Sequence, residues 1–223
     1  MTDDGVLLID LDDTLIDRQA GLRSWATRFL RNLGRDTRDE LAWVVDLDGT
    51  GLTPREVLFG GIRDRYGLVD DVPAIMDAYY QGFPPLIPQP PADTYAALAE
   101  ARAVGWKICI VTNGGSRAQV PKISPELAAA VDGWVISETV GVGKPDPRIL
   151  HVAAAEVDCR LTPESWLIGD RPETDVLGAV RAGIRSVWIS RGLRRDSLLP
   201  YRPTLEASTI ADAVPRILAF DGQ

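Results

Sequence analysis

Near the start of the chain lies the stretch Val6-Leu7-Leu8-Ile9-Asp10-Leu11-Asp12-Asp13-Thr14, in which an apolar run leads directly into an acidic segment. A short apolar run of this kind is typical of a buried strand. Strands that alternate with helices form parallel sheets, so we expect a doubly wound, Rossmann-like α/β core. The other runs that predict strands, mostly separated by helical patterns, are Ile108–Val111, Trp134–Ile136, Trp166–Ile168 and Ser186–Ile189.

The long interval between Asp10 and Ile108 predicts an insertion into this core. Apolar residues recur with helical spacing after Leu22 and again around Ile75. A proline-rich stretch that begins at Pro84 then ends the helical pattern. We therefore expect an all-helical cap over residues 17–83 and a core domain of residues 1–16 and 84–223.

The composition limits the classes of partner. The chain has 223 residues and a net charge of −8, which argues against nucleic acids and anionic membranes, because both require a basic surface. No apolar run is long enough for a membrane span, and the acidic residues of the first four positions are unlike a secretory signal, so we expect a cytoplasmic protein. The single histidine, His151, excludes histidine triads and multi-histidine metal sites, and we expect it on a helix surface or in packing.

Polar residues follow the predicted strands at the positions where ligands bind in open α/β sheets. Carboxylates that converge at one sheet edge repel one another unless a cation neutralises them, and hard oxygen ligands favour Mg²⁺. A phosphate beside such a metal needs a positive side chain, backbone amides and a hydroxyl. The candidates at the strand ends are Asp10, Asp12, Thr112, Asn113, Gly114, Lys144, Asp170 and Asp175.

Within this set, Lys144, Gly114 and Thr112 can supply the phosphate contacts. Asp10 and Asp12 are two residues apart, so one carboxylate can attack phosphorus while the other transfers protons. The pattern thus predicts a site of phosphoryl transfer.

The ordered motifs resemble those of the haloacid dehalogenase-like (HAD) superfamily, in its subfamily I with a helical cap of the C1 type after the first motif. The resemblance rests on Asp10-Leu11-Asp12-Asp13-Thr14-Leu15, Val111-Thr112-Asn113-Gly114, Gly143-Lys144-Pro145-Asp146-Pro147 and the segment from Gly169-Asp170 to Asp175. Asp13 stands where glycine is commonest in the family. True dehalogenases lack a carboxylate at the place of Asp12, which argues for the phosphatase branch.

The resemblance implies a role for each candidate residue. Asp10 would be the nucleophile and a metal ligand, and Asp12 the acid/base residue that gives the metal its backbone carbonyl. Thr112, Asn113 and Lys144 would hold the phosphate. Asp170 would bind Mg²⁺ directly, and Asp175 would support the metal shell or orient Lys144.

The segment Asp46-Leu47-Asp48-Gly49-Thr50 matches the text of the first motif, but its context places it in the cap. Gly51 replaces the usual leucine, and too little chain would remain for a cap before Thr112. We interpret the segment as a solvated turn between cap helices in preference to a substrate contact, and we likewise expect the cap arginines, such as Arg18, Arg55 and Arg63, to lie on the solvated surface.

These observations predict a magnesium-dependent phosphatase that hydrolyses a small phosphate monoester, of the nucleotide or sugar phosphate type, through an aspartyl-phosphate. The alternatives are a phosphomutase of the same superfamily and a non-catalytic regulator that binds a phosphorylated metabolite. The expected partner is a small phosphorylated metabolite, and the sequence leaves both a monomer and a homodimer open.

Overall fold

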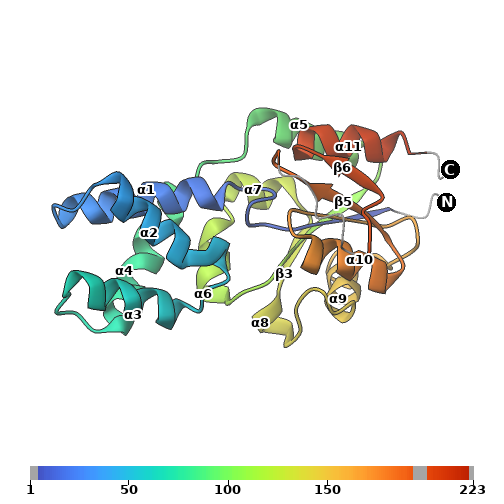
Figure 1. Ribbon diagram of the computed structural model, residues 1–223. Coiled ribbons are helices and arrows are strands. Elements are labelled where there is room, and N and C mark those ends of the chain that lie inside the picture. Colours follow the sequence, from blue (N-terminus) through green and yellow to red (C-terminus); the bar gives the residue numbers. More distant parts are fainter. Residues whose placement is uncertain (1–4, 193–199, 221–223) are drawn as a thin grey trace. The chain divides into compact units, whose positions relative to one another are not determined.

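The computed structural model describes residues 5–192 and 200–220. The chain divides into two compact units, an α/β unit of residues 1–16 and 89–223 and a helical unit of residues 17–88 (Figure 1). Residues 1–4, 193–199 and 221–223 of the expected core lie outside the described residues.

Within the described residues, the α/β unit contains a sheet of six parallel strands in the order β3-β2-β1-β4-β5-β6. All five predicted strands are present, which confirms the predicted fold class. The sixth strand was not predicted, because it is three residues long and has no apolar run. The strands are β1 (Val6–Ile9), β2 (Lys107–Thr112), β3 (Gly133–Ile136), β4 (Trp166–Gly169), β5 (Arg185–Ile189) and β6 (Leu205–Ala207).

The register of the central strands aligns their carboxyl ends. Ile9 of β1 is paired with Ile110 of β2 on one side and with Ile168 of β4 on the other. The chain leaves β1 for β2 on one side and later adds β4 on the other, so this is the point at which the strand order reverses. Ligands of doubly wound folds bind at such a point.

Helices cover both faces of the sheet. In Figure 1, α9 (Arg148–Glu156) and α10 (Leu177–Ala182) lie on one face, and α5 (Ala92–Ala103) and α11 (Ile210–Leu218) lie on the other. The α/β unit also contains the short helices α6 (Ser116–Gln119), α7 (Pro125–Ala130) and α8 (Ser137–Val140), a 3-10 helix η3 (Val120–Lys122) and a π-helical turn η4 (Pro172–Val176). None of the helices among the described residues has both the length and the apolar character needed to cross a membrane.

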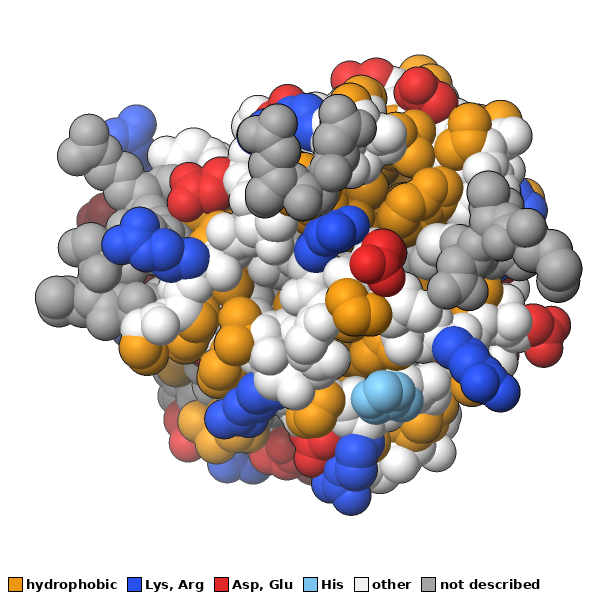
Figure 2. All heavy atoms as spheres, turned by 90° about the vertical axis from the view of Figure 1, so that its right-hand side faces the viewer, with side chains coloured by type: hydrophobic (Ala, Val, Ile, Leu, Met, Phe, Trp, Pro, Cys, Tyr) orange, Lys and Arg blue, Asp and Glu red, His pale blue; other side chains and the backbone are white. Residues whose placement is uncertain are grey.

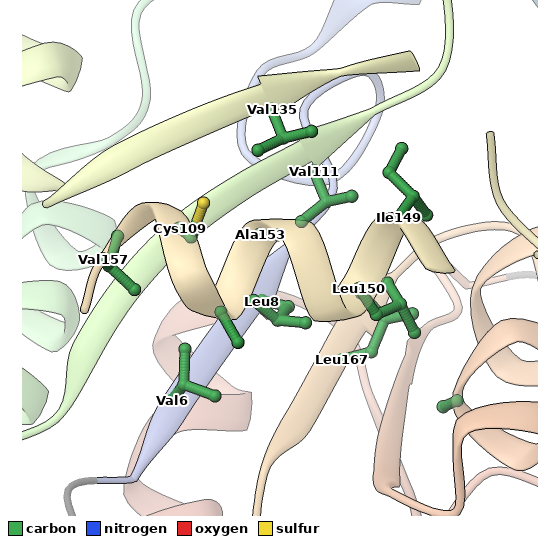
Figure 3. Close-up of a cluster of buried hydrophobic side chains, with 12 residues drawn as sticks. Val6, Leu8, Cys109, Val111, Val135, Ile149, Leu150, Ala153, Val157 and Leu167 are labelled. Atoms are coloured by element: carbon green, nitrogen blue, oxygen red, sulfur yellow. The ribbon is translucent and has the colours of Figure 1, made fainter. Parts of the chain in front are cut away.

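The core beneath α9 shows why the strands read as continuous apolar runs. Figure 3 shows Ile149 and Ala153 of α9, with Val157 directly after the helix, in one buried cluster with Cys109 and Val111 of β2. Full burial of a valine or isoleucine side chain contributes about 1.5–3 kcal/mol. The sheet is therefore a rigid base from which the strand-end residues project.

Figure 2 shows one face of the protein, where basic and acidic side chains are interspersed with hydrophobic ones. His151 is exposed on α9, in agreement with its expected place on a helix surface. On the part of this face that the structure describes, the Lys and Arg side chains are scattered and do not form a continuous patch.

The helical unit consists of α1 (Arg18–Asn32), α2 (Arg38–Asp48), α3 (Arg55–Tyr66) and α4 (Val72–Gly82). Its core is aromatic: the ring of Trp25 meets Phe59 edge-on with centroids 6.0 Å apart, and Tyr79 with centroids 5.0 Å apart. The side chain of Asp17 caps α1 by accepting a hydrogen bond from the backbone of Ala20. The apolar positions with helical spacing thus pack against one another inside this unit.

The helical unit ends after Pro88, five residues later than the expected boundary at residue 83. The first prolines do not form an extended linker, because Pro84–Leu86 makes a 3-10 helix, η2. Ile87 is buried and lies so close to Gly21 of α1 that a Cβ there would overlap its side chain. Packing against α1 therefore assigns residues 84–88 to this unit.

The prediction of a solvated turn at Asp46–Thr50 is wrong, because Asp48 is fully buried at the end of α2. Its carboxylate accepts two hydrogen bonds from Arg18, at 2.6 and 3.0 Å, and one from Arg55 at 2.8 Å. Arg18 is 2% exposed, so its expected surface position is also wrong, and Arg55 is half-buried. A carboxylate can be buried here because two guanidinium groups neutralise it.

Asp48 is buried and Asp46 of the same segment is exposed, so the two aspartates provide a test and its matched control. Asp48→Asn should lower the free energy of unfolding by about 3–5 kcal/mol, because it leaves buried arginine charge uncompensated. Asp46 is exposed, so Asp46→Asn should change stability by less than about 0.5 kcal/mol. Urea unfolding of both variants measures the difference, and equal stabilities would contradict the buried ion cluster.

The contribution of Asp48 should also depend on pH. Burial acts to raise the pKa of Asp48, but the hydrogen bonds and charges of Arg18 and Arg55 outweigh it and hold the pKa below its usual value. A lowered pKa in the folded state stabilises the protein above the unfolded-state pKa of about 4, and this gain is lost as the pH falls through the folded-state value. The stability gap between wild type and Asp48→Asn should therefore be full at neutral pH and narrow in acid.

Candidate active site

A buried lysine links two of the predicted carboxylates at the carboxyl edge of the sheet. The Nζ atom of Lys144 lies 2.6 Å from Oδ1 of Asp10, which follows β1, and 2.8 Å from Oδ1 of Asp175, which lies in η4 after β4. Lys144 itself comes from the loop after β3, and its side chain is 2% exposed. The three residues are far apart in sequence, and the parallel topology brings them together.

The titration behaviour of the site reflects crowded negative charge. Burial raises the pKa of Asp10 despite Lys144, and the charges of Asp175 and Asp12 act in the same direction. Burial also raises the pKa of Asp170 to about 8, with further contributions from Asp10 and Asp175. Burial would lower the pKa of Lys144, but Asp10 and Asp175 outweigh it and raise that pKa. One lysine does not balance this group of carboxylates.

The same carboxylates fit a divalent cation. One oxygen each of Asp10, Asp170 and Asp175 lies within 4.8 Å of the others. Oδ1 of Asp175 is buried and makes no hydrogen bond within the described residues, although it is close to Lys144. A set of hard oxygen donors with excess negative charge is the ligand type that Mg²⁺ prefers.

Gly169 allows Asp175 to reach this position. A Cβ atom on Gly169 would overlap the carboxyl group of Asp175, so only glycine permits so close an approach at the end of β4. The backbone N–H of Arg171 donates a hydrogen bond of 2.9 Å to Oδ2 of Asp175 and fixes its orientation. The carboxylate is thus held between a strand end and a turn of η4.

The residues at the end of β2 and directly after it make different contacts. The side chain of Asn113 accepts a hydrogen bond from the backbone N–H of Lys144 and donates one to its carbonyl, both at 2.8 Å. This side chain therefore holds the Lys144 loop, and its expected contact with phosphate stays a prediction. The N–H of Gly114 donates to Ser137 Oγ at 2.9 Å, and Thr112 is buried at the strand end.

The turn after β1 explains the residue type at position 13. Asp13 has φ 60°, in the left-handed region, which glycine adopts without strain. Aspartate tolerates this conformation better than most residues. Arg191 donates hydrogen bonds to the carbonyl of Asp13 at 3.1 Å and to its carboxylate at 3.2 Å.

Two residues that the sequence analysis missed contact the predicted acid/base residue. Lys122 Nζ lies 2.6 and 2.8 Å from the two carboxylate oxygens of Asp12, and Gln119 Nε2 lies 3.2 Å from one of them. Gln119 is at the end of α6 and Lys122 at the end of η3. Their i,i+3 spacing just after the second motif was the available signal, because residues three apart on a helix lie on one side.

Magnesium binding can be measured without an assay of activity. Mg²⁺ should raise the melting temperature of the wild type, and a hundredfold excess over the dissociation constant corresponds to about 2.7 kcal/mol. Asp170→Asn should lose most of this response, yet with chelator it should be at least as stable as wild type, because it removes a repelling charge. Asp93→Asn, an exposed substitution in the first turn of α5, should respond like wild type. An unchanged response in Asp170→Asn would exclude this residue as a ligand.

Gly169 offers a steric test of the same site. Gly169→Ala should displace Asp175, lower stability by about 1–3 kcal/mol as overpacking does, and weaken the Mg²⁺ response. Gly178→Ala in α10 is the control, since a Cβ there meets its nearest neighbour, Pro145 Cα, at an ordinary 3.5 Å. Thermal unfolding with and without Mg²⁺ compares the variants, and equal behaviour would contradict the close approach.

Comparison with known proteins places this geometry in a family. A family model described as HAD-hydrolase-like matches residues 141–213. Over 102 residues, the chain is 41% identical to a phosphoserine phosphatase from Thermus thermophilus, a match that covers 45% of this chain and 41% of the relative. The chain thus matches less than half the length of that relative.

Longer matches extend over most of the chain. A Pseudomonas putida protein named probable phosphoglycolate phosphatase is 30% identical over 190 residues, which cover 80% of this chain and 72% of the relative. The HAD hydrolase YfnB from Bacillus subtilis, whose structure is described as bound to magnesium, superposes with a TM-score of 0.75 at 22% identity, covering 94% of this chain and 96% of YfnB. This protein belongs to the haloacid dehalogenase-like hydrolase family.

Proposed function

We propose that the protein is a magnesium-dependent phosphatase that hydrolyses small phosphate monoesters through an aspartyl-phosphate on Asp10. The observation that carries this proposal is the convergence of Asp10, Asp170 and Asp175 at one sheet edge, where Lys144 pairs with Asp10 and Asp175. Asp12 follows Asp10 by two residues and supplies a second carboxylate for proton transfer. These groups are what phosphoryl transfer requires.

In the first half-reaction, a carboxylate oxygen of Asp10 attacks phosphorus. A new O–P bond forms, the P–O bond to the leaving group breaks, and Asp12 gives its proton to the departing oxygen. Lys144 lies 2.6 Å from Asp10, so it is placed to hold the attacking carboxylate and to offset negative charge on the phosphoryl oxygens.

In the second half-reaction, water attacks the phosphorus of the aspartyl-phosphate. Asp12 accepts a proton from this water, the bond between Asp10 and phosphorus breaks, and inorganic phosphate leaves. Bound Mg²⁺, held by Asp10, Asp170, the backbone carbonyl of Asp12 and the support of Asp175, would neutralise the phosphate charge. Because Asp12 returns to its protonated form, the cycle is complete.

The substrate class follows from the relatives and from the helical unit. Two of the relatives carry the names phosphoserine phosphatase and probable phosphoglycolate phosphatase, and phosphoserine and phosphoglycolate are both small phosphorylated acids. We propose a small phosphorylated metabolite as substrate, with the nucleotide and sugar phosphate types included. The helical unit, inserted directly after the first motif, would act as the cap that selects the leaving group and excludes water.

The first test is release of inorganic phosphate from phosphoserine, phosphoglycolate, a nucleoside monophosphate, a hexose phosphate and p-nitrophenyl phosphate. Wild type should release phosphate with Mg²⁺ and not with chelator. Asp10→Asn should reduce the rate by roughly a thousandfold or more, because the nucleophile is lost, while it retains the fold. Asp93→Asn should keep wild-type activity.

Each other outcome has a defined meaning. Substantial activity in Asp10→Asn would defeat the proposed nucleophile. Isomerised sugar phosphate without free phosphate would identify the phosphomutase alternative. Silence across the panel, with and without Mg²⁺, would favour the non-catalytic regulator.

A further inference from the structure

Lys122 and Gln119 form a buried polar contact with Asp12 that no step of the proposed reaction uses. The Lys122 side chain is 6% exposed, and both oxygens of Asp12 lie within 2.8 Å of its Nζ atom. Gln119 is 3% exposed and reaches the same carboxylate at 3.2 Å. Lysine is almost never buried without a specific partner, so the position of this charge requires an explanation.

The amide of Gln119 connects three parts of the site. Its Nε2 atom lies 2.7 Å from the carbonyl of Asn113, 3.0 Å from Oγ1 of Thr112 and 3.2 Å from Asp12. A carbonyl and a carboxylate only accept hydrogen bonds, which fixes this end of the amide as the donor. An amide nitrogen does not accept hydrogen bonds, so the O–H hydrogen of Thr112 is directed to another acceptor.

One feature of Gln119 is not explained by a contribution to the stability of the fold. Its Oε1 atom is buried and makes no hydrogen bond within the described residues. An unsatisfied buried acceptor costs about 1–3 kcal/mol, and an apolar side chain of the same size would avoid this cost. The neighbouring backbone leaves room for the amide, since Gly114 at φ +141° lacks the Cβ that would approach Gln119 Nε2.

We propose that Lys122 and Gln119 are positioning residues that hold the Asp12 carboxylate for proton transfer, with Gln119 also orienting the Thr112 hydroxyl toward the phosphate. This inference rests on the proposed phosphatase function. Lys122 and Gln119 both direct donor groups at the Asp12 carboxylate, so together they restrict its rotation. A carboxyl group with a fixed orientation can transfer its proton to an oxygen at a defined position.

The dependence of the rate on the leaving group separates this role from a structural one. An alkoxide leaving group needs the proton of Asp12, whereas dinitrophenolate leaves without one. The ratio kcat/KM reports the steps up to departure of the leaving group, so later hydrolysis of the aspartyl-phosphate does not obscure it. General acid catalysis contributes about 10²–10⁴-fold to a rate. The fall in kcat/KM that Asp12→Asn causes with the alkyl phosphate, and not with dinitrophenyl phosphate, can be no larger than this.

The experiment compares an alkyl phosphate with 2,4-dinitrophenyl phosphate, in the full-length protein with Mg²⁺. Lys122→Met and Gln119→Leu, which keep the size of each side chain, should each lower kcat/KM for the alkyl phosphate by roughly tenfold or more, a part of the general-acid effect. They should lower kcat/KM for dinitrophenyl phosphate much less. Lys122→Arg should recover part of the loss, and Lys122→Met should add little to Asp12→Asn, because the two residues act as one unit.

Lys107→Met is the matched control. Lys107 also pairs with an aspartate, Asp132, at 3.2 Å, but it lies at the opposite end of β2 from Thr112. Its substitution should leave both kcat/KM values and their ratio unchanged. Because the dinitrophenyl substrate reports an intact site in each variant, a folding defect is recognised directly.

Two results overturn the inference while the proposed function stands. Equal losses on both substrates would show that Lys122 and Gln119 serve only the structure, and wild-type values in both variants would show that Asp12 needs neither. A wild-type protein that hydrolyses neither substrate would overturn the proposed function and this inference with it.

Discussion

The contact between Lys144 and its two carboxylate partners is the interaction on which the site depends. A buried ammonium group 2.6 Å from Asp10 and 2.8 Å from Asp175 is stable only while both partners are in place. The side chain of Asn113 in turn fixes the backbone of Lys144. The loop after β3, the turn after β1 and the η4 turn after β4 are therefore locked together by one charge.

The parallel sheet makes this arrangement possible. Because β1 lies between β2 and β4 in register, residues that follow these strands meet at one edge of the sheet although they are far apart in the sequence. The apolar core under α9 fixes the strand ends, and the polar groups need only short side chains to meet. Rigid strands below and charged loops above give the proposed cation and phosphate site a fixed geometry.

Asp48 shows how the same chemistry serves stability instead. Its segment carries the letters of the first motif, yet its carboxylate is buried between Arg18 and Arg55 in the helical unit. The motif sequence alone does not distinguish the segment at Asp10 from the segment at Asp48. What differs is the element that precedes it, a buried strand for Asp10 and the end of α2 for Asp48.

The sequence by itself determined five of the strands, the helical insertion and the identity of the residues at the strand ends, because apolar runs and motif spacing are local properties. Only the tertiary structure decided which side chains contact one another. It turned Asn113 toward the Lys144 backbone, buried Arg18 with Asp48, and brought Gln119 and Lys122 to Asp12. Local pattern carries no information on which buried charge meets which, because that pairing depends on how distant segments fold against one another.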